Sequence, residues 1–77
     1  MKLENHAIYQ IRIKGVLDQR WSDWFAPLKI RNESNGESIL TGEVRDQAEL
    51  RSLIDKVFNL NLTLVAVDKL QDPPWIH

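Results

Sequence analysis

The segment DQAELRSLIDKVFNL, from Asp46 to Leu60, constrains the fold of this chain most strongly, because its apolar residues recur at helical spacing. They fall at i, i+3, i+4, i+7 and i+8 and form one stripe: Leu50, Leu53, Ile54, Val57 and Phe58. Asp46 can cap the helix, and Glu49 three residues later completes a variant of the capping box. A helix that is apolar on one side must cover another element. We therefore expect the rest of the chain to form a sheet beneath it.

Four segments have the pattern of β-strands. Ala7–Lys14 alternates between apolar and polar side chains with a period of two. Leu28–Glu33 and Glu37–Val44 flank the sequence Ser-Asn-Gly, and a three-residue turn with a left-handed glycine keeps the apolar residues of both strands on one face. Leu62–Val67, LTLVAV, is the last strand and is apolar on both faces apart from one threonine. The chain therefore supplies a four-stranded sheet.

The stretch LDQRWSDWFAP predicts a second, shorter helix. Asp18 is a good N-cap, and Pro27 limits the helix to about two turns. Trp21, Trp24 and Phe25 fall on one stripe, which favours a role in the core over a ligand platform. Such a short helix is marginal alone, so its aromatic residues must hold it against the sheet.

This β-α-β-β-α-β order predicts an α+β fold of the ferredoxin-like type. We expect a four-stranded antiparallel sheet of order 4-1-3-2, with two helices on one face. The 77 residues make one domain. Its core spans about residues 7–70, and residues 71–77 form a tail with two consecutive prolines.

Composition excludes several functional classes. The chain has no cysteine, so it has neither disulfides nor a thiolate zinc site. The two histidines lie near the chain ends, and no nucleophile or phosphate-loop motif occurs, so we expect no catalytic, cofactor or metal residues and no enzyme activity from a single chain. A net charge of -1 and the absence of an RNA-recognition pattern argue against nucleic acid. Without a signal peptide or a long apolar run, we expect a cytoplasmic protein with no membrane contact.

Basic residues gather on the predicted open face of the sheet. They come from the first two strands: Arg12, Lys14, Lys29 and Arg31. This face either binds an anion or an acidic partner, or is an ordinary solvated surface. Arg20 lies on no apolar stripe, so it either pairs with a carboxylate such as Asp18 or Asp23, or serves a site.

The last strand carries the stronger interaction signal. It is predicted to be an edge strand without charges between residues 62 and 67, and such edges pair with other chains unless they are covered. We expect Thr63, Val65 and Val67 to form a dimer or partner interface. Trp75, after two prolines in the tail, either anchors a partner or packs on this chain's own surface.

Three stretches, GVLDQRWSDWF, LTGEVRDQAELRSLI and LNLTLVAVDKL, resemble a family of small uncharacterised prokaryotic proteins. That family's pattern is GxLDxRWxxWF followed by LTGxxxDQAxLxxLL, with Ile54 here in place of the final leucine. The likeness covers about residues 9–70. It implies a single domain of this plan and no particular mechanism.

The leading hypothesis is a small protein-interaction or regulatory module that forms a homodimer, or binds an unknown protein partner, through the last strand or the outer sheet face. Two alternatives remain. One is an anion- or ligand-binding domain that uses the basic face, and the other is a dimeric enzyme with a pocket between subunits.

Overall fold

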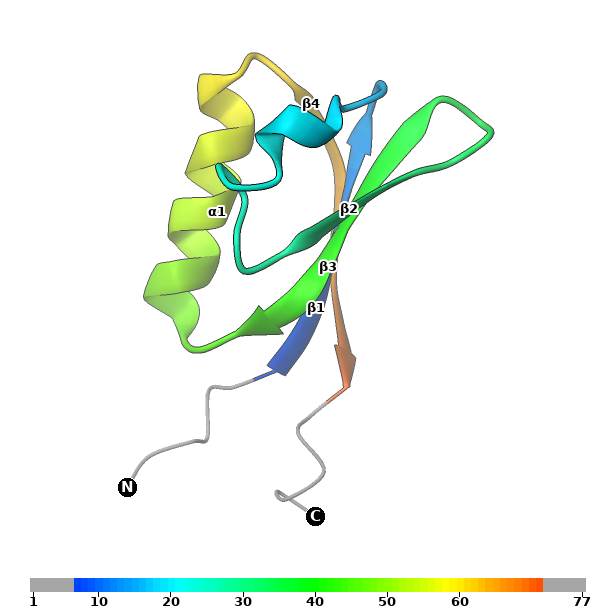
Figure 1. Cartoon of the computed structure of the whole chain (residues 1–77). Helices are drawn as coiled ribbons and strands as arrows, with labels where there is room; N and C mark the ends of the chain where they lie inside the picture. The colour runs from blue at the N-terminus through cyan, green and yellow to red at the C-terminus, as the bar shows by residue number, and fades with distance from the viewer. Residues whose placement is uncertain (1–6, 72–77) are drawn as a thin grey trace.

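The computed structural model describes residues 7–71, which form one sheet covered on one face (Figure 1). The elements in chain order are β1 (Ala7–Lys14), the 3₁₀ turn η1 (Gln19–Trp21), β2 (Lys29–Asn32), β3 (Glu37–Val44), α1 (Gln47–Asn59) and β4 (Thr63–Gln71). All neighbouring strands are antiparallel, and the sheet order is β2-β3-β1-β4. The predicted strand order is confirmed.

The hairpin between β2 and β3 has the predicted register, with Ile30 opposite Leu40. The backbone N–H of Glu33 donates to the carbonyl of Glu37 at 2.7 Å, which closes a three-residue turn. Gly36 within that turn has a φ of 86°, the left-handed region that favours glycine. The predicted three-residue turn with a left-handed glycine is therefore confirmed.

α1 begins and ends where the sequence indicates. The Asp46 carboxylate accepts from the backbone N–H of Glu49 at 2.8 Å, and the Glu49 carboxylate accepts from the backbone N–H of Arg45 at 2.8 Å. Asn61, just beyond the helix, has a φ of 61° and ends it. Leu53 and Val57 are fully buried, whereas Phe58 at the margin of the predicted stripe is 54% exposed.

The prediction of a second helix between Asp18 and Pro27 is wrong. Only η1 is helical, and the chain then continues through turns to Pro27. Asp18 does cap it, accepting from the backbone N–H of Arg20 at 2.8 Å. Most backbone hydrogen bonds that follow join residues three apart, as between Leu28 and Phe25 at 2.9 Å, so no regular α-helix forms. The fold thus has one helix, and the two-helix ferredoxin-like plan does not hold.

The core lies between the sheet and a layer made of α1 and the loop of residues 15–28 (Figure 1). Buried residues from both layers fill it: Ala7, Tyr9, Ile11, Ile13, Leu17, Phe25, Leu28, Leu40, Val44, Leu53 and Val57. The predicted inward face of β1 is therefore confirmed. The loop occupies the space that a second helix would fill, and Phe25 is its fully buried anchor.

A buried hydroxyl ties the start of this loop to the sheet. Ser38 is completely buried, and its Oγ lies 2.6 Å from the carbonyl of Gly15 and 2.7 Å from the Oδ1 of Asn32. It also accepts from the backbone N–H of Leu17 at 2.9 Å. The Asn32 side chain donates to the Leu17 carbonyl at 3.0 Å. Three backbone groups at the start of the loop, the Gly15 carbonyl and the N–H and carbonyl of Leu17, thereby have hydrogen-bond partners.

Candidate interaction surfaces

β4 is an edge strand with one unpartnered side within residues 7–71. It pairs with β1 alone, and its nine residues make it longer than a typical strand. Its charged residues are Asp68 and Lys69, both in its second half. An edge of this length presents unpaired backbone N–H and C=O groups to any chain that approaches.

Two β-bulges interrupt β4. Its register against β1 shifts between Ile13 and Arg12, and again between Tyr9 and Ile8. Each shift leaves one extra residue on β4, and these are Val65 and Leu70. Their side chains are 47% and 48% exposed.

The bulge at Val65 separates the residues of the predicted interface, which itself stays a prediction. Alternation would place Val65 and Val67 on one face, but Val67 lies opposite Ile11 and packs against the core. Thr63 lies at the start of the strand opposite Lys14. Trp75 lies outside the described residues. The exposed apolar side chains of this edge are therefore the bulged residues, which a pattern of strict alternation could not identify.

Phe58 lies on the flank of α1 that faces the β4 edge. Lys56 marks the opposite flank, because its ammonium group donates to the Trp24 carbonyl at 3.0 Å in the loop of residues 15–28. Phe58 is two positions after Lys56, which corresponds to a rotation of about 200° around the helix axis. Phe58 therefore points away from that loop. The sheet order and the packing of α1 on β4 place this second flank beside the free edge.

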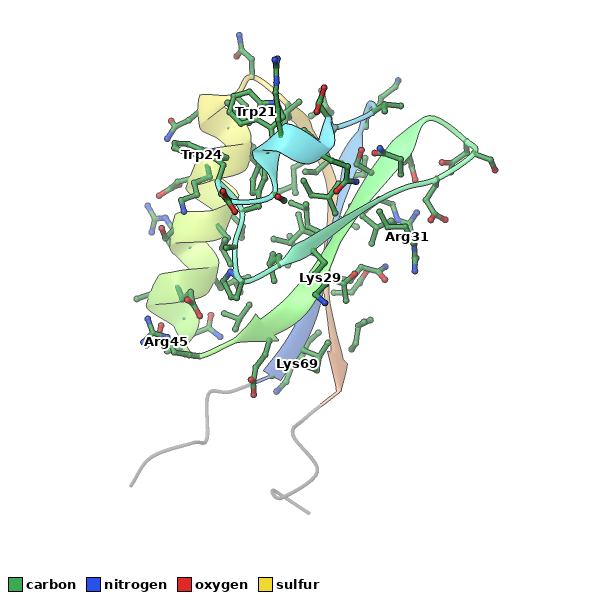
Figure 2. The ribbon with its side chains drawn as sticks, in the orientation of Figure 1. Trp21, Trp24, Lys29, Arg31, Arg45 and Lys69 are labelled. Atoms are coloured by element: carbon green, nitrogen blue, oxygen red, sulfur yellow. The ribbon has the colours of Figure 1, made fainter. Side chains whose placement is uncertain are left out.

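The outer face of the sheet carries the predicted basic residues, but ion pairs occupy two of them. Arg12 lies 2.9 Å from the Glu37 carboxylate, and Arg31 lies 2.8 Å from that of Glu33. Lys14 is opposite Glu37 in the register, and Figure 2 shows Lys29 and Arg31 projecting from β2. The four cations are confirmed on this face, where carboxylates interleave with them and weaken the case for anion binding.

A fully buried isoleucine lies in the middle of this outer face. Ile39 is directly opposite Arg12 on one side and Arg31 on the other. It belongs to no part of the helix-side core, and its two cross-strand neighbours are long side chains whose apolar stems can cover it. The arginines therefore cover apolar surface as well as carrying charge.

Electrostatics on this face centre on Glu37. The hydrogen bond from the Arg12 guanidinium lowers the pKa of the Glu37 carboxyl below its usual value of 4.5. Desolvation opposes that shift in pKa, and the Asn35 side chain adds a second stabilising hydrogen bond at 3.2 Å. The carboxylate is consequently ionised throughout the neutral range.

The two tryptophans of the loop form a partly exposed pair beside α1 (Figure 2). Their ring centroids are 6.4 Å apart in an edge-to-face arrangement. The Arg20 guanidinium lies 5.7 Å from the Trp21 ring centroid, and the Lys56 ammonium lies 5.4 Å from that of Trp24. A carboxylate partner was one of the two alternatives for Arg20, and the structure instead places its guanidinium near an indole ring. The other alternative, a role in a site, stays a prediction. Each ring thus already has a cationic neighbour, which reduces its value as a ligand platform.

Other classes of site find little support in the described part of the chain. Residues 7–71 contain no group of three metal-ligating side chains that could hold an ion. No helix among the same residues is long and apolar enough to cross a membrane.

Comparison with known proteins adds a family but no activity. Neither a curated protein nor a solved structure matches this chain. A family model described as a domain of unknown function, DUF8691, matches residues 8–68. That span runs from β1 into the second half of β4, so it includes every buried core residue except Ala7, and also the bulge at Val65. The chain therefore belongs to the DUF8691 family of uncharacterised domains.

Proposed function

We propose that this protein is a small interaction module that self-associates through the free edge of β4. The observation that carries the proposal is the edge itself. It is nine residues long, it is paired on one side within residues 7–71, and its two bulged residues, Val65 and Leu70, are apolar and about half exposed. Pairing would satisfy its open backbone groups and remove Val65 and Leu70 from water.

The edge is a better contact surface than the outer sheet face. On the outer face Ile39 is already buried, so a partner would gain little apolar area there. Covering that face would also desolvate the Arg12–Glu37 pair, and such a penalty can exceed the attraction within the pair. Along β4 a partner would instead cover Val65 and Leu70, which are apolar and about half exposed.

Sedimentation of the full chain across micromolar concentrations tests this proposal. We expect a reversible dimer, and we expect Val65→Lys to raise its dissociation constant at least about tenfold, because a lysine on an edge opposes strand pairing. Val16→Lys is the matched control, because Val16 is also an exposed valine, at 69%, but lies in the loop after β1. It should leave the dissociation constant unchanged.

Two results would contradict the proposal. One is a wild-type chain that sediments as a monomer up to several hundred micromolar. The other is an equal loss of association in Val65→Lys and Val16→Lys, which would indicate a general effect of added charge rather than a contact at β4.

A further inference from the structure

We infer that two copies of this chain pair their β4 strands in an antiparallel register centred on Val67, so that the sheet continues from one copy into the other. This inference rests on the proposed function and specifies its geometry. It follows from the positions of the bulges, the apolar side chains and one carboxylate along β4.

Symmetry fixes the direction of pairing. When the same edge of two identical sheets meets about a two-fold axis, the two strands run antiparallel. If residue i of the first copy lies opposite residue j of the second, then residue j of the first lies opposite residue i of the second. The axis stands perpendicular to the sheet, so both copies of α1 lie on the same face. The two ends of β4 are then brought together, with the Thr63 end of each copy beside the Gln71 end of the other.

The register follows from the bulges and from Asp68. The stretch between the bulges, Ala66–Lys69, is in unbroken register with β1, so an axis near its middle gives the longest regular pairing. An axis at Asp68 would set that carboxylate opposite its own copy, which is unfavourable. An axis at Val67 instead places Asp68 opposite Ala66 and Lys69 opposite Val65. Val67 is therefore the centre.

This arrangement brings together the apolar residues that a single copy exposes separately. Val65 lies near the start of β4. Phe58 lies in the last turn of α1, and only a short connection separates that turn from the start of β4. Leu70 lies at the other end of the strand. In the antiparallel pair Leu70 of one copy is opposite Leu64 of the other, beside Val65 and beneath Phe58. A foreign strand would not supply this match, which argues for a second copy as the occupant.

The spacing of the helices also suits a phenylalanine at the seam. α1 packs against β3 and β4, the two neighbours of β1, so its axis runs over β1. Across the seam the two helices would be three strand spacings apart, or about 14 Å at roughly 4.8 Å each. Helices in direct contact lie about 8–10 Å apart. Large side chains on the facing flanks are needed to fill the remaining gap, and Phe58 is a large exposed apolar side chain on that flank.

Single-cysteine variants test this register, because the chain has no native cysteine. A residue on the axis faces its own copy with the Cα atoms about 4.5–5.5 Å apart, within the range for a disulfide. We expect Val67→Cys to form a covalent dimer under mild oxidation. Thr63→Cys is the control, because its two copies would lie roughly 25 Å apart at about 3.3 Å per residue. It should stay monomeric on a denaturing gel.

A second pair of variants reports from the outer face, where the cysteines do not compete with core packing. Ala66 faces Asp68 of the other copy in this register, so an oxidised mixture of Ala66→Cys and Asp68→Cys should yield the mixed dimer, identified by its mass. Circular dichroism of each variant checks that the fold is retained.

The outcomes separate the two proposals. A wild-type dimer whose Val67→Cys variant and mixed Ala66→Cys and Asp68→Cys sample both fail to cross-link would overturn the register while leaving self-association intact. Efficient cross-linking of Thr63→Cys would overturn it as well. A wild-type monomer would remove the proposed function and this inference together.

Discussion

Replacing Phe25 with alanine should cost much more stability than replacing Trp24 with alanine, although the two aromatic residues are adjacent in the sequence. Phe25 is fully buried between the sheet and α1, whereas Trp24 is 39% exposed. The sequence pattern had placed both on one buried stripe, and on that pattern alone Trp24→Ala would be expected to cost about 3–5 kcal/mol. The structure reverses the ranking of the two positions.

The magnitudes follow from burial. Phe25→Ala removes a fully buried ring and leaves a cavity, so the free energy of unfolding should fall by about 3–5 kcal/mol. Trp24→Ala loses roughly 90 Å² of buried area beyond that of alanine, which is worth about 2 kcal/mol at ~25 cal/mol per Å². Its site is open to water, so no cavity term is added. That figure includes no separate contribution from Lys56, whose ammonium lies near the Trp24 ring.

Urea denaturation followed by far-ultraviolet circular dichroism measures both costs, because Trp24→Ala removes a fluorophore but leaves the dichroism signal usable. Phe25→Leu, with an expected loss of about 1–2 kcal/mol, keeps the comparison valid if Phe25→Ala does not fold. A loss of stability in Trp24→Ala as large as that in Phe25→Ala, or a Trp24→Ala variant that fails to fold while Phe25→Ala folds, would refute the assignment of Phe25 as the anchor of the loop.

Three further changes test other parts of the fold. Ser38→Ala should lower the free energy of unfolding by about 1–3 kcal/mol, because it leaves the Gly15 carbonyl without its 2.6 Å partner; a change under about 0.5 kcal/mol in urea denaturation would contradict this. Gly42→Ala should lower the free energy of unfolding by about 1–3 kcal/mol in the same measurement, because the added Cβ would lie 2.9 Å from Leu28 Cδ2 and 3.1 Å from Leu28 Cα. An unchanged free energy of unfolding would contradict this and would show that the backbone before β2 can shift. Glu37→Gln should flatten the acid limb of the stability curve. The folded-state pKa of Glu37 lies below 4.5, so its contribution is present above that pH and is lost as the pH falls through the lowered pKa. Denaturation midpoints of wild type and variant at pH 3 to 7 should therefore converge at the acid end, and a constant difference would contradict the assignment.

The strand order and the main helix were predictable because strong local signals agree with each other. The period-two alternation of β1, the three-residue turn before β3 and the apolar stripe of α1 each admit one arrangement, and together they select one sheet order. The loop of residues 15–28 was not predictable in the same way. Trp21, Trp24 and Phe25 have helical spacing, but a segment this short follows whichever conformation best buries one of its rings.

The candidate surfaces were predicted less completely, because a pattern assigns residues to a face but does not show what their neighbours do. The cations of the outer face are where the alternation places them. Their ion pairs with Glu33 and Glu37 depend on rotamers and cross-strand geometry, which the sequence does not specify. Arg20 illustrates the same limit, because its partner is the ring of the next residue rather than a carboxylate.

The bulges of β4 connect the fold to the proposed assembly. Without them, strict alternation would put Val65 and Val67 on one face, and the edge would be a flat strand open to any other strand. With them, Val67 is free to complete the core while Val65 and Leu70 stay outside. The regular pairing surface is limited to the few residues between the bulges, flanked at each end by an apolar side chain. A regular segment bounded in this way disfavours open-ended stacking of strands. In the register centred on Val67 each bulged residue lies within one position of a bulge of the other copy, and a second copy of the same chain supplies that correspondence.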